Sequence, residues 1–100
     1  MVKLAILAHV EAKPGKEDAV ARFLAAALPL VEAEGRTVAW FGFQTGPSTF
    51  AIFDTFEDEA GRDAHLTGEV AKGLMAVADE LFARPPVIEK ADLIAVKMPR

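Results

Sequence analysis

The chain has 100 residues, of which 52% are hydrophobic and 26% are charged, with a net charge of −4 and no cysteine. This length fits a single domain over residues 1–100, and the balance of residues supplies a hydrophobic core rather than a disordered chain. The acidic charge argues against nucleic acid as a partner. The lack of cysteine excludes disulfides, thiolate nucleophiles, zinc–thiolate sites and iron–sulfur clusters.

The first predicted element is a strand over residues 2–12, VKLAILAHVEA, closed by the turn signal Lys13-Pro14-Gly15. Its apolar run is short, and His9 and Glu11 interrupt it, so it fits neither an export signal nor a membrane span. We therefore expect a protein that works in the cytoplasm and makes no membrane contact.

Residues 16–34 change to a helical pattern, because apolar side chains recur there at spacings of three and four. Glu17 and Asp18 fall in the first turn, where negative charge complements the helix dipole. Gly35 follows as the predicted C-terminal cap. The side chains predicted to share the buried face are Val20, Phe23, Leu24, Ala27, Leu28 and Val31.

Two aromatic-rich strands are predicted next, over residues 37–45 and 49–56, joined by a turn around Gly46-Pro47-Ser48. Asp58 then caps a short helical piece. The helix continues after a Thr67-Gly68 break until Pro85-Pro86 ends it. Residues 87–98 form the last predicted strand.

This order is βαββαβ, the ferredoxin-like α+β plan, with two helices on one face of a four-stranded antiparallel sheet. The sheet pattern is apolar on both faces: Trp40 lies on one face, while Phe41 and Phe43 lie on the other. Two helices cover only one face. The pattern therefore predicts a homodimer formed through the helix-free face of the sheet.

Three segments carry a resemblance to a known family: KPGKEDAVARFL (13–24), FGFQTGPSTFAIFDTFEDEAGRDAHLTG (41–68) and PPVIEKADLIAVK (85–97). Together they resemble the antibiotic biosynthesis monooxygenase domain family of dimeric α/β barrels, over essentially the whole chain. The phrase from GPSTFAIFDTF to AHL is the most specific part. The resemblance implies ferredoxin-like subunits whose sheets pair into a barrel across the dimer.

The resemblance also implies several activities, because one fold hosts many functions. Some members oxygenate polycyclic aromatic or quinol substrates with molecular oxygen and no metal or flavin. Related barrels degrade haem, and many members have no established activity. The expected function is therefore a cofactor-independent monooxygenase acting on an aromatic or quinol-type small molecule, with no cofactor and no metal.

His65 and Asp54 are the predicted catalytic residues. Cofactor-free oxygenation needs a group that removes a hydroxyl proton from the substrate, and the ordinary pKa of histidine suits that task. His65 also matches a histidine that family members often carry. Asp54 shares a strand face with apolar residues, so it needs a partner such as His65 or Arg62. The structural alternatives are a histidine bonded to backbone at the helix break and an aspartate at an exposed strand end.

An apolar or aromatic ligand needs ring-shaped and flexible side chains to hold it. The predicted substrate-binding residues are Trp40, Phe50, Ile52, Phe56 and Met75. The alternative is that these aromatic strand residues form only the core or the dimer interface. His9 is expected to point toward the helix-free face, which makes it a weaker candidate than His65.

The chain departs from the better-understood members in two ways, because it contains no tyrosine and no asparagine. A phenolic proton relay is therefore excluded, and haem degradation is disfavoured. No phosphate-binding loop and no metal-ligand spacing is present. Two alternatives to the oxygenase remain: a non-catalytic barrel that binds a small molecule, and an isomerase or lyase that transfers protons through His65 and Asp54.

Overall fold

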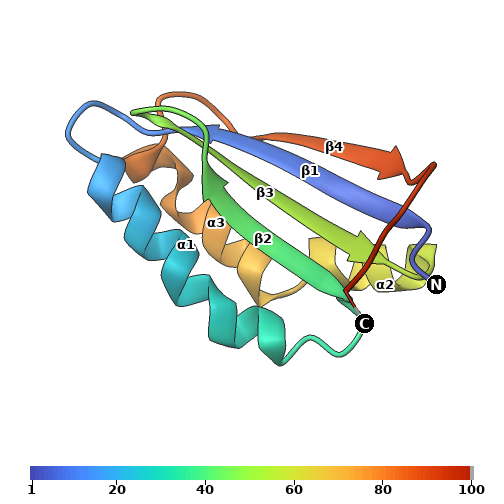
Figure 1. The fold of residues 1–100 in the computed structure, drawn as a ribbon. Coiled ribbons are helices and arrows are strands. Elements are labelled where there is room, and N and C mark those ends of the chain that lie inside the picture. The colour runs from blue at the N-terminus through green and yellow to red at the C-terminus, as the bar shows by residue number, and fades with distance from the viewer. Residues whose placement is uncertain (100) are drawn as a thin grey trace.

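The structure is a computed structural model that describes residues 1–99. Its strands are β1 (Leu4–Glu11), β2 (Ala39–Gln44), β3 (Thr49–Phe56) and β4 (Val87–Asp92). Its helices are α1 (Glu17–Glu32), α2 (Glu59–Leu66) and α3 (Glu69–Leu81). The strands form one antiparallel sheet in the order β2-β3-β1-β4, and the helices lie on one side of it (Figure 1). The ferredoxin-like βαββαβ prediction is confirmed, with the second helix broken into α2 and α3.

Local signals explain most element boundaries. The Asp58 side chain accepts a hydrogen bond of 2.8 Å from the Gly61 amide and so caps α2, as predicted. The predicted cap at Gly35 is wrong, because α1 ends at Glu32 and its C-cap residue is Ala33, which has right-handed helical geometry. The glycine with positive φ is Gly15 (φ 85°), in the turn after β1, where the lack of a Cβ removes the steric penalty.

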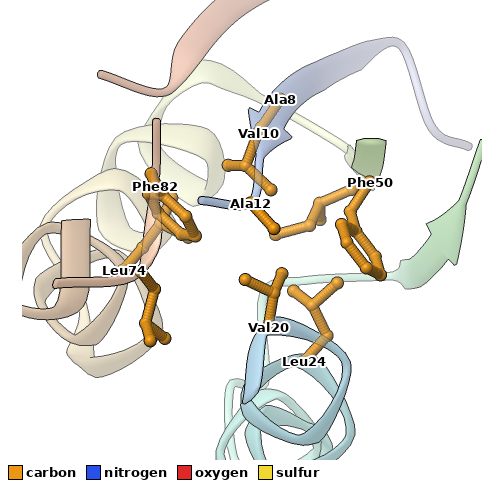
Figure 2. Close-up of a cluster of buried hydrophobic side chains, with 10 residues drawn as sticks. Ala8, Val10, Ala12, Val20, Leu24, Phe50, Leu74 and Phe82 are labelled. Atoms are coloured by element: carbon orange, nitrogen blue, oxygen red, sulfur yellow. The ribbon is translucent and has the colours of Figure 1, made fainter. Parts of the chain in front are cut away.

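The main core lies between the helices and the sheet. Val10 and Phe50 point down from β1 and β3, and Val20 and Leu24 of α1 rise to meet them (Figure 2). Leu74 and Phe82 close the same cluster from the side of α3 (Figure 2). This packing holds α1 and α3 against the centre of the sheet. The full set of buried cluster residues is Ala8, Val10, Ala12, Val20, Leu24, Phe50, Ile52, Leu74, Leu81 and Phe82.

The opposite face of the sheet carries no helix. The register pairs Phe41 with Phe53 and Phe43 with Ala51, and both β2 phenylalanines are substantially exposed, at 57% and 42%. His9 is paired with Ala51, so it lies on this same face, and it is exposed. The prediction that Trp40 and these phenylalanines lie on opposite faces agrees with the register.

The last strand is shorter than predicted. Strand pairing ends at Asp92, opposite Leu4, rather than at residue 98 as predicted. The Leu93 amide still donates to the Lys3 carbonyl at 2.8 Å. Residues 93–99 then cross in front of β1 and β3 toward the start of β2 (Figure 1). Ala5 and Thr55 are buried although their strand positions face away from the helices.

Candidate functional site

Asp54 occupies the middle of the sheet on its helix side. It is directly opposite Trp40 of β2 and Ile6 of β1, and only 1% of its surface is exposed. Strand alternation places it there, because Phe50, Ile52 and Phe56 on the same face are all buried. A carboxylate in such surroundings requires a compensating partner. The alternative prediction, that Asp54 lies at an exposed strand end, is therefore wrong.

His65 reaches Asp54 from the last turn of α2. The helix buries one face, which carries Gly61, Arg62 and His65, and the His65 residue is 7% exposed. The break after it is made by Thr67, whose hydroxyl donates to the Asp63 carbonyl at 3.0 Å, and by the Gly68 amide, which donates to the His65 carbonyl at 3.1 Å. These bonds end α2 and fix the imidazole against β3.

The imidazole lies between two carboxylates. His65 Nε2 is 2.9 Å from Asp54 Oδ2, and Nδ1 is 2.6 Å from Glu34 Oε1. The first contact is close but poorly directed, so neither carboxylate oxygen of Asp54 has a well-formed hydrogen bond among residues 1–99. We call Glu34, His65 and Asp54 the acid–imidazole cluster. It joins the α1–β2 loop, α2 and β3.

The environment of the cluster changes the protonation of His65. Burial alone would disfavour the imidazolium, yet the close polar contacts with Asp54 and Glu34 and the charges of both carboxylates outweigh it, so the pKa of His65 is raised above its ordinary 6.5. The ring also contacts Phe56, with centroids 5.5 Å apart. His65 is therefore an unsuitable free base, since both ring nitrogens are occupied.

Glu34 is the member of the cluster that the sequence analysis missed. It stands just beyond α1, 31 residues before His65, and its Oε1 atom also accepts from the Thr37 hydroxyl at 2.9 Å. No spacing rule links a loop carboxylate to a histidine so far away in the chain. The only local signal was its position between an amphipathic helix and a glycine.

Arg62 is buried as well but does not pair with Asp54. Its Nη1 atom donates to the carbonyls of Ala91 at 3.2 Å and Ala5 at 3.4 Å, while its Nε has no partner among residues 1–99. It thus ties α2 to β1 and β4. Of the two partners predicted for Asp54, the structure places His65 and not Arg62 in contact with it.

An apolar pocket of about 360 Å³ lies between α1 and the edge strand β2. Trp40 and Phe50 line it, together with Leu24 and Leu28 of α1. The indole of Trp40 passes over Gly42, where a Cβ would lie 3.1 Å from Cη2, so the glycine leaves space for the ring. Trp40 Nε1 is buried without a hydrogen-bond partner among residues 1–99. The residues that line this pocket include neither Asp54 nor His65.

The predicted substrate-binding residues fall into three places. Trp40 and Phe50 line the α1–β2 pocket, and Ile52 lies in the core cluster beside it. Phe56 is fully buried against His65. Met75 is 58% exposed on α3 and lines a separate surface pocket with Leu66 and Ile88. The structure therefore does not bring Met75 together with the others.

The described residues offer no metal centre and no membrane span. Within residues 1–99, no three His, Cys, Asp or Glu side chains are placed to hold a metal ion together. Glu34 and Asp54 approach opposite nitrogens of His65 and do not converge on one point. In the same part of the chain, no helix is both long and apolar enough to cross a membrane.

The fold recurs in solved structures at low sequence identity. No protein-family model and no curated protein matches the chain. A structure named antibiotic biosynthesis monooxygenase is 19% identical, with a TM-score of 0.79 over 92% of this chain and 99% of that one. PA3566 from Pseudomonas aeruginosa is 21% identical, with a TM-score of 0.81 over 95% and 97%. These likenesses establish the shared fold.

One solved structure is much more similar. The NE2512 protein of unknown function from Nitrosomonas europaea is 57% identical, with a TM-score of 0.97, over 100% of this chain and 97% of that one. Identity at this level over the full length shows common family membership. The chain therefore belongs to the same family as the NE2512 protein.

Proposed function

We propose that this protein binds an apolar, aromatic small molecule that carries a hydroxyl group in the α1–β2 pocket, and oxygenates it without a cofactor. The observation that carries the proposal is the position of Trp40. Its side chain lines the pocket, and its strand position lies directly opposite Asp54, which contacts His65. Trp40 therefore lies between the apolar pocket and the buried Asp54–His65 pair, which we propose transfers the proton.

The pocket suits a planar ligand. Its volume of about 360 Å³ lies within the roughly 300–1,000 Å³ range of small-molecule sites. Its lining is mainly aliphatic and aromatic, which favours ring stacking over polar recognition. Trp40 is the lining residue whose ring can stack on such a ligand.

The chemistry requires one proton transfer and one dioxygen molecule. Removal of the hydroxyl proton by the Asp54–His65 pair leaves an electron-rich anion that reduces dioxygen. At a CH₂ group conjugated with that anion, one oxygen atom becomes the carbonyl oxygen of the product. The second oxygen atom leaves as water with the two hydrogens of the CH₂ group. The structures named antibiotic biosynthesis monooxygenases, which are 12 to 19% identical, support oxygenation as the reaction class.

Oxygen uptake with a panel of quinols and anthrones tests this proposal. Wild-type protein should consume oxygen in proportion to product. Asp54→Asn should lower kcat/KM at least about 100-fold, because a positioned acid–base group contributes that much. Asp63→Asn is the matched control, since Asp63 is an exposed aspartate on α2 and its substitution should leave activity unchanged.

Two further results sharpen the test. Trp40→Leu keeps an apolar side chain in the pocket but removes the ring, and should weaken binding of a planar ligand by roughly 2- to 10-fold, in line with aromatic stacking worth about 0.5–1.5 kcal/mol. If a ligand binds with no oxygen consumption, the oxygenase is wrong and a non-catalytic binding barrel takes its place. If no member of the panel binds, the pocket assignment itself is wrong.

We also propose that the functional unit is a homodimer paired through the helix-free face of the sheet. Phe41 and Phe43 are exposed there, and Val87 at the edge strand is 52% exposed. Exposed aromatic side chains in one patch favour association, because burying them removes apolar surface from water.

A further inference from the structure

His65 presents a chemical constraint that its neutral form cannot satisfy. A neutral imidazole has one N–H donor and one bare nitrogen that only accepts. Both ring nitrogens face carboxylate oxygens, at 2.6 Å and 2.9 Å. With both acids ionised, a neutral ring would set a lone pair against a carboxylate in a buried place. Only a ring that carries both protons serves both partners.

The charges around the ring reinforce this constraint. Glu34 approaches from the α1–β2 loop and Asp54 from β3, while the strand positions opposite Asp54 are Ile6 and Trp40, which carry no charge. Arg62, on α2 itself, spends its Nη1 donors on backbone carbonyls. Two negative charges thus bracket one histidine, and the pKa of His65 is raised despite its burial.

Glu34 is itself held in place. Its Oε1 atom accepts from Thr37, and its Oε2 atom packs at the α2–α3 break, 3.3 Å from where a Cβ would stand on Gly68. Its side chain is 21% exposed, against 8% for His65 and 1% for Asp54. The Glu34 carboxylate is thus held by Thr37 and by packing at the α2–α3 break, as well as by the imidazole.

We propose that Glu34 is a positioning residue that, together with Asp54, holds His65 as the doubly protonated imidazolium, so that Asp54 and not His65 accepts a proton at this site. The second half of this inference rests on the proposed function. Asp54 suits the role because Oδ1 has no hydrogen-bond partner among residues 1–99. The adjacent imidazolium stabilises the carboxylate and orients it, as a fixed positive charge beside an anion does.

Nuclear magnetic resonance of the ring nitrogens tests the inference without any ligand. The chain has two histidines, His65 and His9, so a nitrogen-15 spectrum contains two imidazoles. His9 is exposed on the other face of the sheet and serves as an internal reference. At neutral pH, both nitrogens of His65 should be protonated and should exchange slowly with water.

Variants at Glu34 identify its role. Glu34→Gln should move the titration midpoint of His65 to lower pH and leave one ring nitrogen bare at neutral pH, and Glu34→Asp should restore part of the shift. Glu32→Gln is the matched control, because Glu32 is exposed at the end of α1 and should change nothing. If oxygen uptake is measurable, Asp54→Asn should lower kcat/KM more than His65→Gln does.

The outcomes separate this inference from the proposed function. A bare ring nitrogen on His65 of the wild type at neutral pH would overturn the inference, even if oxygenation occurs. The same holds if Glu34→Gln folds and titrates as the wild type does. If Glu34→Gln does not fold, the wild-type spectrum alone still decides the protonation state. Failure of every substrate in the oxygen assay, with an intact imidazolium, would overturn the proposed function and the Asp54 role but not the charge assignment.

Discussion

The imidazole of His65 ties together three segments that are far apart in the chain. Glu34 follows α1, Asp54 belongs to β3, and His65 lies on α2. Breaking one partner of such a buried charged group is costly, because the remaining charge loses its compensation. The cluster therefore fixes the end of α1, the sheet and α2 relative to one another, whether or not it also transfers a proton.

Stability should depend on pH through His65. Its pKa is higher in the folded protein than the ordinary 6.5. The stabilisation is thus fully present below pH 6.5 and is lost as pH rises through the folded value. We expect the thermal midpoint of the wild type to fall as pH increases across that window.

The variant His65→Gln checks this dependence. Glutamine still donates a hydrogen bond but does not titrate, so the fall in thermal midpoint should flatten over the same pH range. His9→Gln is the comparison, since His9 lies on the opposite face of the sheet and contacts neither carboxylate of the cluster. A slope equal to that of the wild type in His65→Gln would show that another group controls the pH dependence.

Two members of the acid–imidazole cluster, Asp54 and His65, could be predicted from the sequence, and the third, Glu34, could not. Asp54 stands out because strand alternation puts a carboxylate among Phe50, Ile52 and Phe56. His65 stands out because histidine is rare in the chain. The two side chains are in contact, and the prediction that Asp54 orients His65 stays a prediction. Glu34 could not be found, because its role depends on how the α1–β2 loop packs on α2, and tertiary packing of a loop leaves no periodic signal.

Among the elements, α2 is short and depends on its ends. Asp58 caps its first turn, and Arg36 pairs with the same side chain at 3.1 Å. The ion pair is exposed on both sides, so it contributes little. The cap satisfies an amide that would otherwise be unpaired, and it is the larger of the two effects.

Asp58→Ala should destabilise the protein by about 1 kcal/mol, within the range of about 0.5–2 kcal/mol for a lost N-cap. Chemical denaturation at equilibrium measures this change. Asp58→Ser is the matched variant, because serine keeps the capping oxygen and removes the charge. Its stability should stay near that of the wild type. Equal losses in both variants would assign the effect to the Arg36 pair instead.

Element boundaries followed from the sequence where the signal was local. Strand β3 spans residues 49–56 as predicted, since a turn of Gly46, Pro47 and Ser48 precedes it and Asp58 follows it. The end of β4 could not be predicted from its own residues. Residues 93–98 are mostly apolar, as a strand can be, yet strand pairing ends at Asp92, opposite Leu4. An apolar composition alone does not show where the pairing ends.

At the scale of the whole molecule, the sheet has one covered face and one open face. The helices and the core cluster occupy the first (Figures 1 and 2). Phe41, Phe43 and Val87 are exposed on or beside the second. The two-faced apolar pattern of the strands predicted this division directly, because side chains alternate between faces with a period of two.

Phe41→Asp should convert a dimer into a monomer. Placing a carboxylate in an apolar interface costs desolvation that the partner cannot compensate. Sedimentation velocity at micromolar concentration measures the change, and circular dichroism checks that the variant folds. Leu30→Asp is the control, since Leu30 is 49% exposed on α1, away from this face. A wild type that sediments as a folded monomer would contradict the proposed dimer.

The segment over residues 93–99 has a consequence for this open face. Beyond the Leu93 bond to Lys3, it makes no backbone hydrogen bond to the sheet among residues 1–99, and Ile94 is 99% exposed. Its amides should therefore exchange with solvent early and its bonds should be cut first by proteases. The segment crosses in front of β1 and β3 (Figure 1), so it and a second molecule would compete for that part of the sheet. Clipping the segment would then enlarge the surface open to that molecule, so proteolysis and association become linked equilibria.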